Sequence, residues 1–384
     1  MNGHFTIGFP YVADRFGGST ASSLVLAQAL QEAGHGVHII THGSGGRVAE
    51  EAVALDLPVT RLPPLSATPS YARPDRFRLE HLLAFRAATR AIAALGLDIV
   101  HTNDITTLRS WAAPALAGRA ALVAHWRSNY RDSWSVKTAL RVAARVVAVS
   151  RGSFIQLPAW VRAKAVVEYN PFASAVTPAA RQAAPAAVRR ALGLPAGAAL
   201  IGVFGNMTAR KRTHLLADVL HAIPRTADGR LVFGLACGGR AEPYDHALDR
   251  KTAVYGLEDR LLRPGFVRPV ETWIAACDLV LAPAVREPFG RTVIEALMLG
   301  VPVAVSSDAG VCELIRDGKT GILCDPDDSA SWIAAARRLL DDSAAARAMA
   351  DGAAGLAAHL APVCHAARIA ALYRELALTG RSAA

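Results

Sequence analysis

Short runs of β-branched residues alternate with amphipathic helical stretches along almost the whole chain. Alternation of this kind is typical of βαβ units, which assemble into parallel sheets. It therefore predicts an α/β protein with two Rossmann-like domains, each built on one series of strands. The first series lies at 4–10, 36–42, 59–63, 98–102, 121–126, 145–150 and 165–170, and the second at 200–206, 231–238, 261–267, 279–283, 302–306 and 321–325.

The length of 384 residues agrees with two domains, because one domain usually holds about 100–200 residues. An Ala- and Pro-rich stretch without a strand period separates the two series. We therefore expect an N-terminal domain at 1–172, a linker with a short helix at 173–199, and a C-terminal domain at 200–360. The helical segment 361–384 has no following strand, and it is a candidate to pack back across the domain junction.

The composition describes a folded globular protein. Hydrophobic residues make up 52% of the chain, and charged residues make up 19%. No apolar stretch of about 18 residues lacks a charge, and no basic segment near the start leads into an apolar one. We therefore expect no membrane-spanning helix, no export signal and a cytoplasmic location. The five cysteines show no C-x-x-C spacing, which favours reduced structural thiols.

Positive charge is concentrated in the first half of the chain. Residues 1–172 carry 18 Lys and Arg against 11 Asp and Glu, whereas the remainder carries 24 against 21. Lys137, Arg141 and Arg145 recur every four residues, which predicts three cations along one side of a helix. That side could face an anionic lipid or an anionic substrate. A solvated helix face is the more common alternative.

The stretch REPFGRTVIEALMLG at 286–300 carries two glutamates around a predicted helix start. The helix follows a strand, so its free N–H groups and positive dipole end lie where a phosphate or diphosphate could bind. Gly290 would let such a ligand approach the backbone closely. Glu287 lies in the loop and Glu295 in the second turn, which suits contacts to two parts of one long ligand. For a single glutamate here, a capping or dipole role is the alternative.

Other candidate groups also follow strand ends. The loop GNMTARKRTHLL at 205–216 carries three basic residues, and Gly17-Gly18 forms a loop after the first strand. No G-x-G-x-x-G follows that strand, which counts against a dinucleotide-binding first domain. His125 ends its strand and should look into a cleft between the domains, whereas His101 lies earlier in its own strand and is expected to be buried. No zinc spacing and no suitably placed D-x-D motif is present, so we expect no metal and no cofactor.

The segment REPFGRTVIEALMLGVPVAVSSDAGVCELIRDGKTGILCDPDD resembles the donor-binding segment of the retaining glycosyltransferases of family GT4. Its Glu287 and Glu295 match the family's E-x7-E signature. RLLRPGFV and AACDLVLAP before it, and FGGSTASSLVLAQALQEAGHGVHIIT, LDIVHTND, ALVAHW and ARVVAVSRGSF in the first half, follow the family's order. The resemblance implies the GT-B fold, in which two Rossmann-like domains face each other across a cleft. It also implies metal-independent transfer of a hexose from a nucleotide-diphosphate sugar, such as a UDP- or GDP-hexose, with retention of configuration.

The resemblance also implies roles for individual residues. Glu287 would accept hydrogen bonds from sugar hydroxyls, Glu295 would hold the ribose, and Lys211 would neutralise the diphosphate. Asn206 stands where the family often has arginine, so one phosphate contact is left open for Arg210 or Arg212. The implied catalytic residues are His125, Lys211 and Glu287. The implied donor-binding residues are Gly18, Asn206, Arg210, Lys211, Phe266, Val267, Glu287, Phe289, Gly290, Arg291, Thr292, Val293 and Glu295. The candidates for acceptor binding are Gly17, Asn103, Asp104, Trp126 and Arg127.

The implied partners are a nucleotide sugar and a glycan, lipid-linked or phosphorylated acceptor, and no nucleic acid. Peripheral association with an anionic inner membrane surface is a subsidiary hypothesis that rests on the charge of the first half. Two alternatives stay open. Sugar-nucleotide epimerases share the GT-B architecture, and a non-catalytic nucleotide-sugar-binding subunit would carry the same donor motifs.

Overall fold

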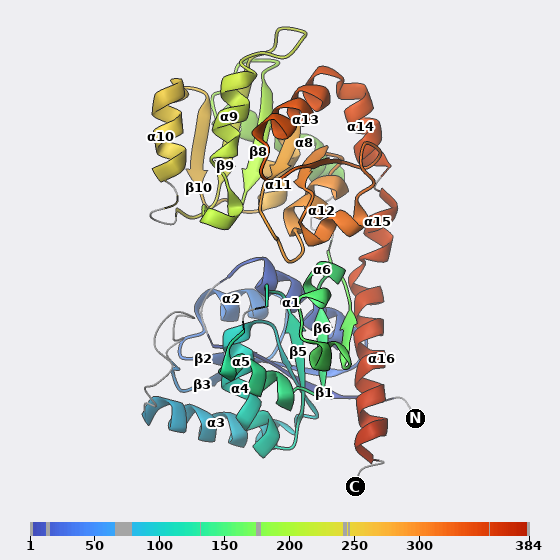
Figure 1. The fold of residues 1–384 in the computed structure, drawn as a ribbon. Coiled ribbons are helices and arrows are strands. Elements are labelled where there is room, and N and C mark those ends of the chain that lie inside the picture. Colours follow the sequence, from blue (N-terminus) through green and yellow to red (C-terminus); the bar gives the residue numbers. More distant parts are fainter. Residues whose placement is uncertain are drawn as a thin grey trace. The chain divides into compact units, whose positions relative to one another are not determined.

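The structure is a computed structural model that describes residues 3–12, 16–65, 79–130, 132–173, 178–240, 244, 246–352 and 354–381. The chain divides into two compact units. Unit 1 consists of Met1–Ala173 and Leu360–Ala384, and unit 2 consists of Ser174–His359. Each unit is built on one parallel sheet (Figure 1). The prediction of two Rossmann-like α/β domains is confirmed.

Unit 1 contains a seven-stranded sheet with the order β3-β2-β1-β4-β5-β6-β7. The order reverses between β1 and β4, and open sheets of this type bind ligands at the carboxyl ends of the strands near such a reversal. Its strands are β1 (Thr6–Tyr11), β2 (Gly36–His42), β3 (Val59–Leu62), β4 (Ile99–Thr102), β5 (Ala121–Trp126), β6 (Arg145–Ala148) and β7 (Ala165–Val167). Its helices are α1 (Gly18–Glu32), α2 (Gly46–Ala54), α3 (Leu79–Leu95), α4 (Ile105–Ala117), α5 (Trp134–Val142), α6 (Arg151–Ile155), α7 (Ala159–Arg162) and α16 (Pro362–Arg381).

Unit 2 repeats the arrangement with the order β10-β9-β8-β11-β12-β13, so its reversal lies between β8 and β11. Its strands are β8 (Ala199–Phe204), β9 (Val232–Cys237), β10 (Leu261–Gly265), β11 (Leu279–Ala282), β12 (Val303–Ser306) and β13 (Ile322–Cys324). Its α-helices are α8 (Pro178–Ala191), α9 (Leu215–Ala222), α10 (His246–Tyr255), α11 (Val270–Ala275), α12 (Arg291–Met298), α13 (Ser329–Asp341), α14 (Ser343–Asp351) and α15 (Ala354–His359). Two 3₁₀ turns, η1 (Ala209–Lys211) and η2 (Gly310–Leu314), complete the described elements.

Alternate residues of the unit 1 strands build two cores on opposite faces of the sheet. Ile99 and Val123 pack with residues of α1, α2 and α16, whereas Val100 and Leu122 pack with residues of α3, α4 and α5. Successive side chains of a strand point to opposite faces, and both faces of this sheet are covered by helices. The central strands β1 and β6 are therefore buried along most of their length, whereas β3 at the edge of the sheet is not.

The last helix, α16, belongs to unit 1 although it follows unit 2 in the sequence (red in Figure 1). It packs against α1, and its residues Ile369, Tyr373 and Leu376 are buried in the same core as the first strand. Unit 1 is therefore completed by a segment that the chain reaches only after unit 2.

The stretch 173–199, which the sequence predicts as a linker, contributes α8 to unit 2. Val188 of this helix is buried. Arg189 donates from Nε to the Ala276 carbonyl at 2.9 Å and from Nη1 to the Ala198 carbonyl at 2.6 Å. From α8 onward the segment is therefore anchored to the unit by side-chain contacts.

One helix ends earlier than its charge pattern predicts. α5 ends at Val142, because Ala143 takes an extended conformation with φ −60° and ψ 125°. Arg145 is the first residue of β6. The prediction of one helix carrying Lys137, Arg141 and Arg145 is therefore wrong, and only the first two lie on α5. None of the described helices is long and apolar enough to cross a bilayer.

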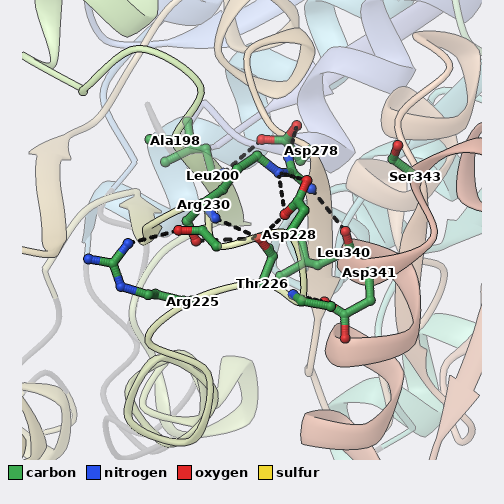
Figure 2. A network of polar contacts seen from close by, with 12 residues as sticks. Ala198, Leu200, Arg225, Thr226, Asp228, Arg230, Asp278, Leu340, Asp341 and Ser343 are labelled. Carbon is green, nitrogen blue, oxygen red and sulfur yellow. Dashed lines mark hydrogen bonds and ion pairs between the residues drawn. The ribbon is translucent and has the colours of Figure 1, made fainter.

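In each sheet an aspartate binds the backbone of the first strand. Asp98 directly precedes β4 and binds β1, and Asp278 directly precedes β11 and binds β8. Asp98 accepts a hydrogen bond from the N–H of Thr6 at 2.8 Å, and Asp278 accepts one from the N–H of Leu200 at 2.8 Å. Asp278 also pairs with Arg189. Figure 2 shows the contacts around Asp278, which include Arg230 with its Nη1 3.9 Å from the carboxylate. This network lies at the amino ends of the strands, opposite the edge where ligands of such folds bind.

Candidate functional site

Loops that leave β8 and β11 bring three predicted site residues together in unit 2. Glu287 Oε2 accepts hydrogen bonds from Lys211 Nζ at 2.8 Å and from Arg210 Nη1. The loop backbones are joined as well, since the N–H of Val285 donates to the Arg210 carbonyl at 3.0 Å. Both strands flank the reversal of the sheet, so the ion pairs lie at the carboxyl edge where α/β sheets bind ligands.

Glu287 is an ionised carboxylate at neutral pH. Burial alone would raise the pKa of this carboxyl, but the charges of Lys211 and Arg210, with their hydrogen bonds, outweigh burial and lower the pKa from 4.5 to about 2. An ionised carboxylate accepts hydrogen bonds and has no proton to donate. The electrostatics thus suit an acceptor of hydrogen bonds and argue against a general acid.

A pocket lies directly over this edge of the sheet. The ends of β8, β11 and β12 form its base, and the loops around η1, α12 and η2 form its walls. Its lining is apolar except for a few polar groups, as in many small-molecule sites. The pocket is lined by Val203, Phe204, Lys211, Leu281, Ala282, Pro283, Ala284, Glu287, Gly290, Thr292, Val293, Val305, Ala309 and Val311.

The start of α12 opens into this pocket. Gly290 caps the helix with φ +110°, a conformation that favours glycine, and no side chain caps the helix. A Cβ at this position would lie 3.0 Å from Val311 Cγ1. The neighbouring Phe289 is buried, and its carbonyl accepts from the N–H of Val311 at 2.7 Å. Val293, predicted to offer its amide to a diphosphate, donates that N–H to the Gly290 carbonyl at 3.1 Å.

Glu295 forms an ion pair within its own helix. Its Oε1 lies 3.1 Å from Nε and 3.0 Å from Nη2 of Arg291, and the side chains are 14% and 18% exposed. Pairs at this spacing are neighbours on a helix surface. Both Glu287 and Glu295 therefore lie beside an arginine, but only Glu287 lines the pocket.

Asn206, Arg212 and Phe266 are not among the residues that line the pocket. Asn206 Oδ1 accepts from the N–H of Gly239 at 3.1 Å, so its side-chain carbonyl ties two loops together. Arg212 turns away from Glu287 and pairs with Asp327 at 3.4 Å. Phe266 is 54% exposed, with the Arg268 guanidinium 5.6 Å from its ring centre.

In unit 1, His125 lies in a buried chain of polar side chains. His101 Nδ1 is 2.6 Å from the Tyr373 hydroxyl, and His101 Nε2 is 3.0 Å from His125 Nδ1. Arg127 Nη2 also lies 3.2 Å from His125 Nδ1, and Arg127 Nη1 donates to Asn170 Oδ1. His101 on β4 pairs with Val123 on β5, and His125 lies two residues after Val123. Both histidines therefore point to the sheet face that α16 covers.

Burial keeps these histidines neutral. Desolvation, followed by the charge of Arg127, lowers the pKa of His101 from 6.5 to about 3. The same two causes, followed by the charges of His101 and His365, hold the pKa of His125 well below 6.5. Neither side chain carries a charge at neutral pH.

The candidates for acceptor binding differ in how their polar atoms are used. Asp104 caps α4, since its two oxygens accept from the N–H and the hydroxyl of Thr107 at 2.8 and 2.6 Å. Asn103 and Trp126 are buried. Gly17, the residue before α1, has extended backbone and open space where a Cβ would lie. Gly18 is the first residue of the helix and is exposed.

Sequence reasoning missed the contributions of distant segments to unit 1. Tyr373 and His365 come from α16, and the ring centre of His365 lies 5.9 Å from that of His125. Asn170 follows β7, near the end of the first of the two segments that form unit 1. The strand period could have placed His101 and His125 on one face, but no local pattern pairs a strand with the last helix. Among the described residues, no group of three or more His, Cys, Asp or Glu side chains could hold a metal ion.

Comparisons with known proteins agree with this architecture. HepE of Anabaena, whose crystal structure was solved with UDP and glucose, superposes with a TM-score of 0.81 over 97% of this chain and 100% of that one, at 22% identity. At this identity the likeness establishes the fold, which is GT-B. The chain thus has the fold of GT-B glycosyltransferases, with a pocket and a half-buried, ion-paired glutamate at the carboxyl edge of its second sheet.

Sequence comparisons identify the family. The profile described as Glycosyltransferase Family 4 matches residues 16–170, and that described as Glycosyl transferases group 1 matches residues 198–342. The chain belongs to this family, the group 1 or GT4 glycosyltransferases.

Two relatives illustrate the similarity. The lipopolysaccharide core biosynthesis mannosyltransferase LpsB of Rhizobium meliloti is 34% identical over 193 residues, 49% of this chain and 55% of that protein. The 2-deoxystreptamine glucosyltransferase of Streptomyces kanamyceticus is 30% identical over 270 residues, 68% of this chain and 66% of that protein. The chain spans about half the length of most of the curated relatives that it matches.

Proposed function

We propose that the chain transfers a hexose from a nucleotide-diphosphate sugar to a hydroxyl of a glycan or lipid-linked acceptor, with retention and without a metal. The observation that carries the proposal is the pocket of unit 2, where Glu287 is held between Lys211 and Arg210 beside the open start of α12. The names of the relatives, a mannosyltransferase and a glucosyltransferase, support hexose transfer.

The roles that we propose follow from charge. Glu287 accepts hydrogen bonds from the sugar hydroxyls, because its carboxylate stays ionised. Lys211 and Arg210 are shared between Glu287 and the diphosphate, and together with the start of α12 they stabilise the charge that develops on the leaving phosphate. Retention without an enzymic nucleophile is explained by front-face transfer, in which the leaving phosphate takes the proton of the acceptor hydroxyl. Glu295 holds the ribose.

A thermal-shift screen tests donor binding. A ligand that binds only the folded protein raises its apparent stability with the logarithm of the ligand concentration. We expect one class among UDP-, GDP- and ADP-hexoses to raise the melting temperature. A screen in which none does so would count against the proposal. Formation of a glycosylated product distinguishes a transferase from a non-catalytic binding subunit, and an epimerised donor without transfer would indicate an epimerase.

Glu287→Ala and Glu295→Ala test the two ends of the donor site. Loss of Glu287 should mainly lower kcat, by about 100-fold, because contacts to the sugar and to Lys211 are lost at the reacting end. Loss of Glu295 should mainly raise KM for the donor, by roughly tenfold, because a hydrogen-bonded contact to the ribose is lost. Equal effects of both variants on both constants would contradict the assigned roles.

We also propose that the acceptor lies at an anionic membrane surface, to which unit 1 binds peripherally. Trp134 at the start of α5 is 80% exposed, and the Arg141 guanidinium lies 5.1 Å from the ring centre of Trp160. Exposed tryptophan and basic residues favour the interface of an anionic bilayer. Liposome sedimentation at low salt should show a preference for anionic over neutral vesicles, reduced by Trp134→Ser. Equal sedimentation with both vesicles would argue against membrane binding.

A further inference from the structure

The buried chain of unit 1 fixes which nitrogen of His125 carries its proton. Two groups approach His125 Nδ1: Arg127 Nη2 at 3.2 Å and His101 Nε2 at 3.0 Å. A guanidinium has only N–H donors and remains charged in proteins. A proton on Nδ1 would therefore face an arginine N–H directly. Nδ1 is therefore the acceptor, and its single lone pair is shared between the two contacts.

The other protons of the chain follow from this one. Since His125 Nδ1 accepts, His101 Nε2 must donate, and it carries the proton of that ring. His101 Nδ1 is then the acceptor of the Tyr373 hydroxyl at 2.6 Å. Tyr373, His101 and His125 thus form a chain of hydrogen bonds that all run in one direction, from α16 toward β5.

The chain of hydrogen bonds ends at His125 Nε2, which is buried and has no hydrogen-bond partner among the described residues. With Nδ1 unprotonated, the neutral ring carries its proton on Nε2. A buried N–H without a partner destabilises the folded protein, which favours a bound acceptor atom. A neutral N–H donor suits a hydroxyl or phosphate oxygen of a ligand.

We propose that Arg127 and Tyr373 position His125 as the Nε2–H tautomer, so that the imidazole presents a hydrogen-bond donor, and not a general base, to an oxygen of the bound substrates. Tyr373 is a positioning residue, because it acts through His101. The tautomer is a property of the free protein, whereas the identity of the contacted oxygen rests on the proposed glycosyl transfer.

Tautomers of histidine can be read directly by nitrogen NMR of the full chain labelled with ¹⁵N-histidine. We expect His125 and His101 to show a protonated Nε2 and an unprotonated Nδ1, with no titration between about pH 6 and pH 8. The charged or titratable groups that act on His125 are Arg127, His101 and His365. Resonances are assigned with His101→Gln and His125→Gln. A protonated Nδ1 on His125 in the free protein would overturn the proposal whether or not the protein transfers sugar.

Tyr373→Phe removes the first donor and keeps the buried ring. The two histidines should then populate both tautomers, and kcat/KM should fall about tenfold, the effect of losing one well-placed hydrogen bond. Tyr11→Phe is the matched control, because it removes another buried phenol of unit 1, whose hydroxyl lies 2.6 Å from Ser23 Oγ. A Tyr373→Phe protein with unchanged tautomers would exclude the positioning role, and so would the same tautomer change in Tyr11→Phe.

Substitution of His125 separates a donor from a base in the reaction itself. The glutamine side chain can place an amide N–H near the Nε2 position but cannot act as a base, whereas asparagine is too short to reach it. His125→Gln should therefore keep a kcat/KM about tenfold above that of His125→Asn. Equal loss in the two variants would contradict the donor role. Absence of turnover in the wild-type chain would instead count against the proposed function.

Discussion

At the scale of single residues, Glu287 links the site to the stability of unit 2. Its pKa is about 2 in the folded protein and 4.5 in the unfolded chain. A lowered pKa stabilises the fold above the unfolded value, and that stabilisation is lost as the pH falls through 4.5 toward 2. The same ion pairs that hold Glu287 ionised in the pocket therefore make the fold sensitive to acid.

Acid unfolding of Glu287→Gln tests this linkage. The free energy of unfolding of the wild type should fall between about pH 5 and pH 2 by up to about 3 kcal/mol more than that of the variant. Chemical denaturation at several pH values measures the difference. Glu50→Gln, which removes an exposed carboxylate on α2, controls for the loss of one charge. Identical pH profiles of Glu287→Gln and the wild type would contradict the lowered pKa.

Gly290→Ala tests the open start of α12. The substitution adds a Cβ at φ +110° and 3.0 Å from Val311 Cγ1, so we expect a loss of about 1–3 kcal/mol of stability and weaker donor binding. Gly256→Ala is the control, since its φ of +60° lies in the left-handed region but a Cβ there meets nothing within 4 Å. Equal destabilisation by both variants would show that the contact with Val311 has no role.

Individual partners were the least predictable part of the site. The sequence indicates that Glu287 and Lys211 belong to one site, but not that Arg210 and Lys211 both bind Glu287 across 77 and 76 positions. The neighbouring arginine, Arg212, pairs instead with Asp327, and its backbone is left-handed, with φ +48°. Ion pairs of this kind are set by loop conformation, which leaves no period in the sequence.

At the scale of elements, Asp98 and Asp278 occupy corresponding positions in the two sheets, so their contributions to stability can be compared. Asp278 and Asp98 bind equivalent strand-start N–H groups, but Asp278 also binds Arg189. Asp278→Ala should therefore cost about 1–3 kcal/mol and Asp98→Ala less, as measured by denaturation. Donor affinity should stay unchanged, because the network of Figure 2 lies at the edge of the sheet opposite the pocket. A larger loss in Asp98→Ala would contradict this ranking.

Strands were the elements that the sequence predicted best. Every predicted strand overlaps a strand of the structure, because short runs of β-branched and apolar residues have a strong local signal. The end of α5 was predicted wrongly, because the four-residue spacing of Lys137, Arg141 and Arg145 continues past the helix into β6. A helix boundary set by backbone conformation at Ala143 has no charge signature.

At the scale of the whole molecule, the discontinuity of unit 1 makes a prediction about folding. The chain 178–359 contains all the described elements of unit 2 and should fold alone. The chain 1–173 should not, because it lacks Ile369, Tyr373 and Leu376 of its own core, whose loss would cost several kcal/mol. Adding a peptide of residues 360–381 should restore cooperative unfolding, which circular dichroism can follow. A cooperative transition of 1–173 without the peptide would contradict this.

The same discontinuity orders events on the ribosome. Domains generally fold as units while the chain emerges from its amino end. Unit 1 is made first, yet the core that α1 and α2 build on the sheet face of His101 and His125 stays incomplete until α16 leaves the exit tunnel. Unit 2 is therefore complete earlier. Helix α16 both completes the core of unit 1 and supplies Tyr373 to His101, so a product interrupted before residue 360 would contain the pocket of unit 2 but lack this tyrosine.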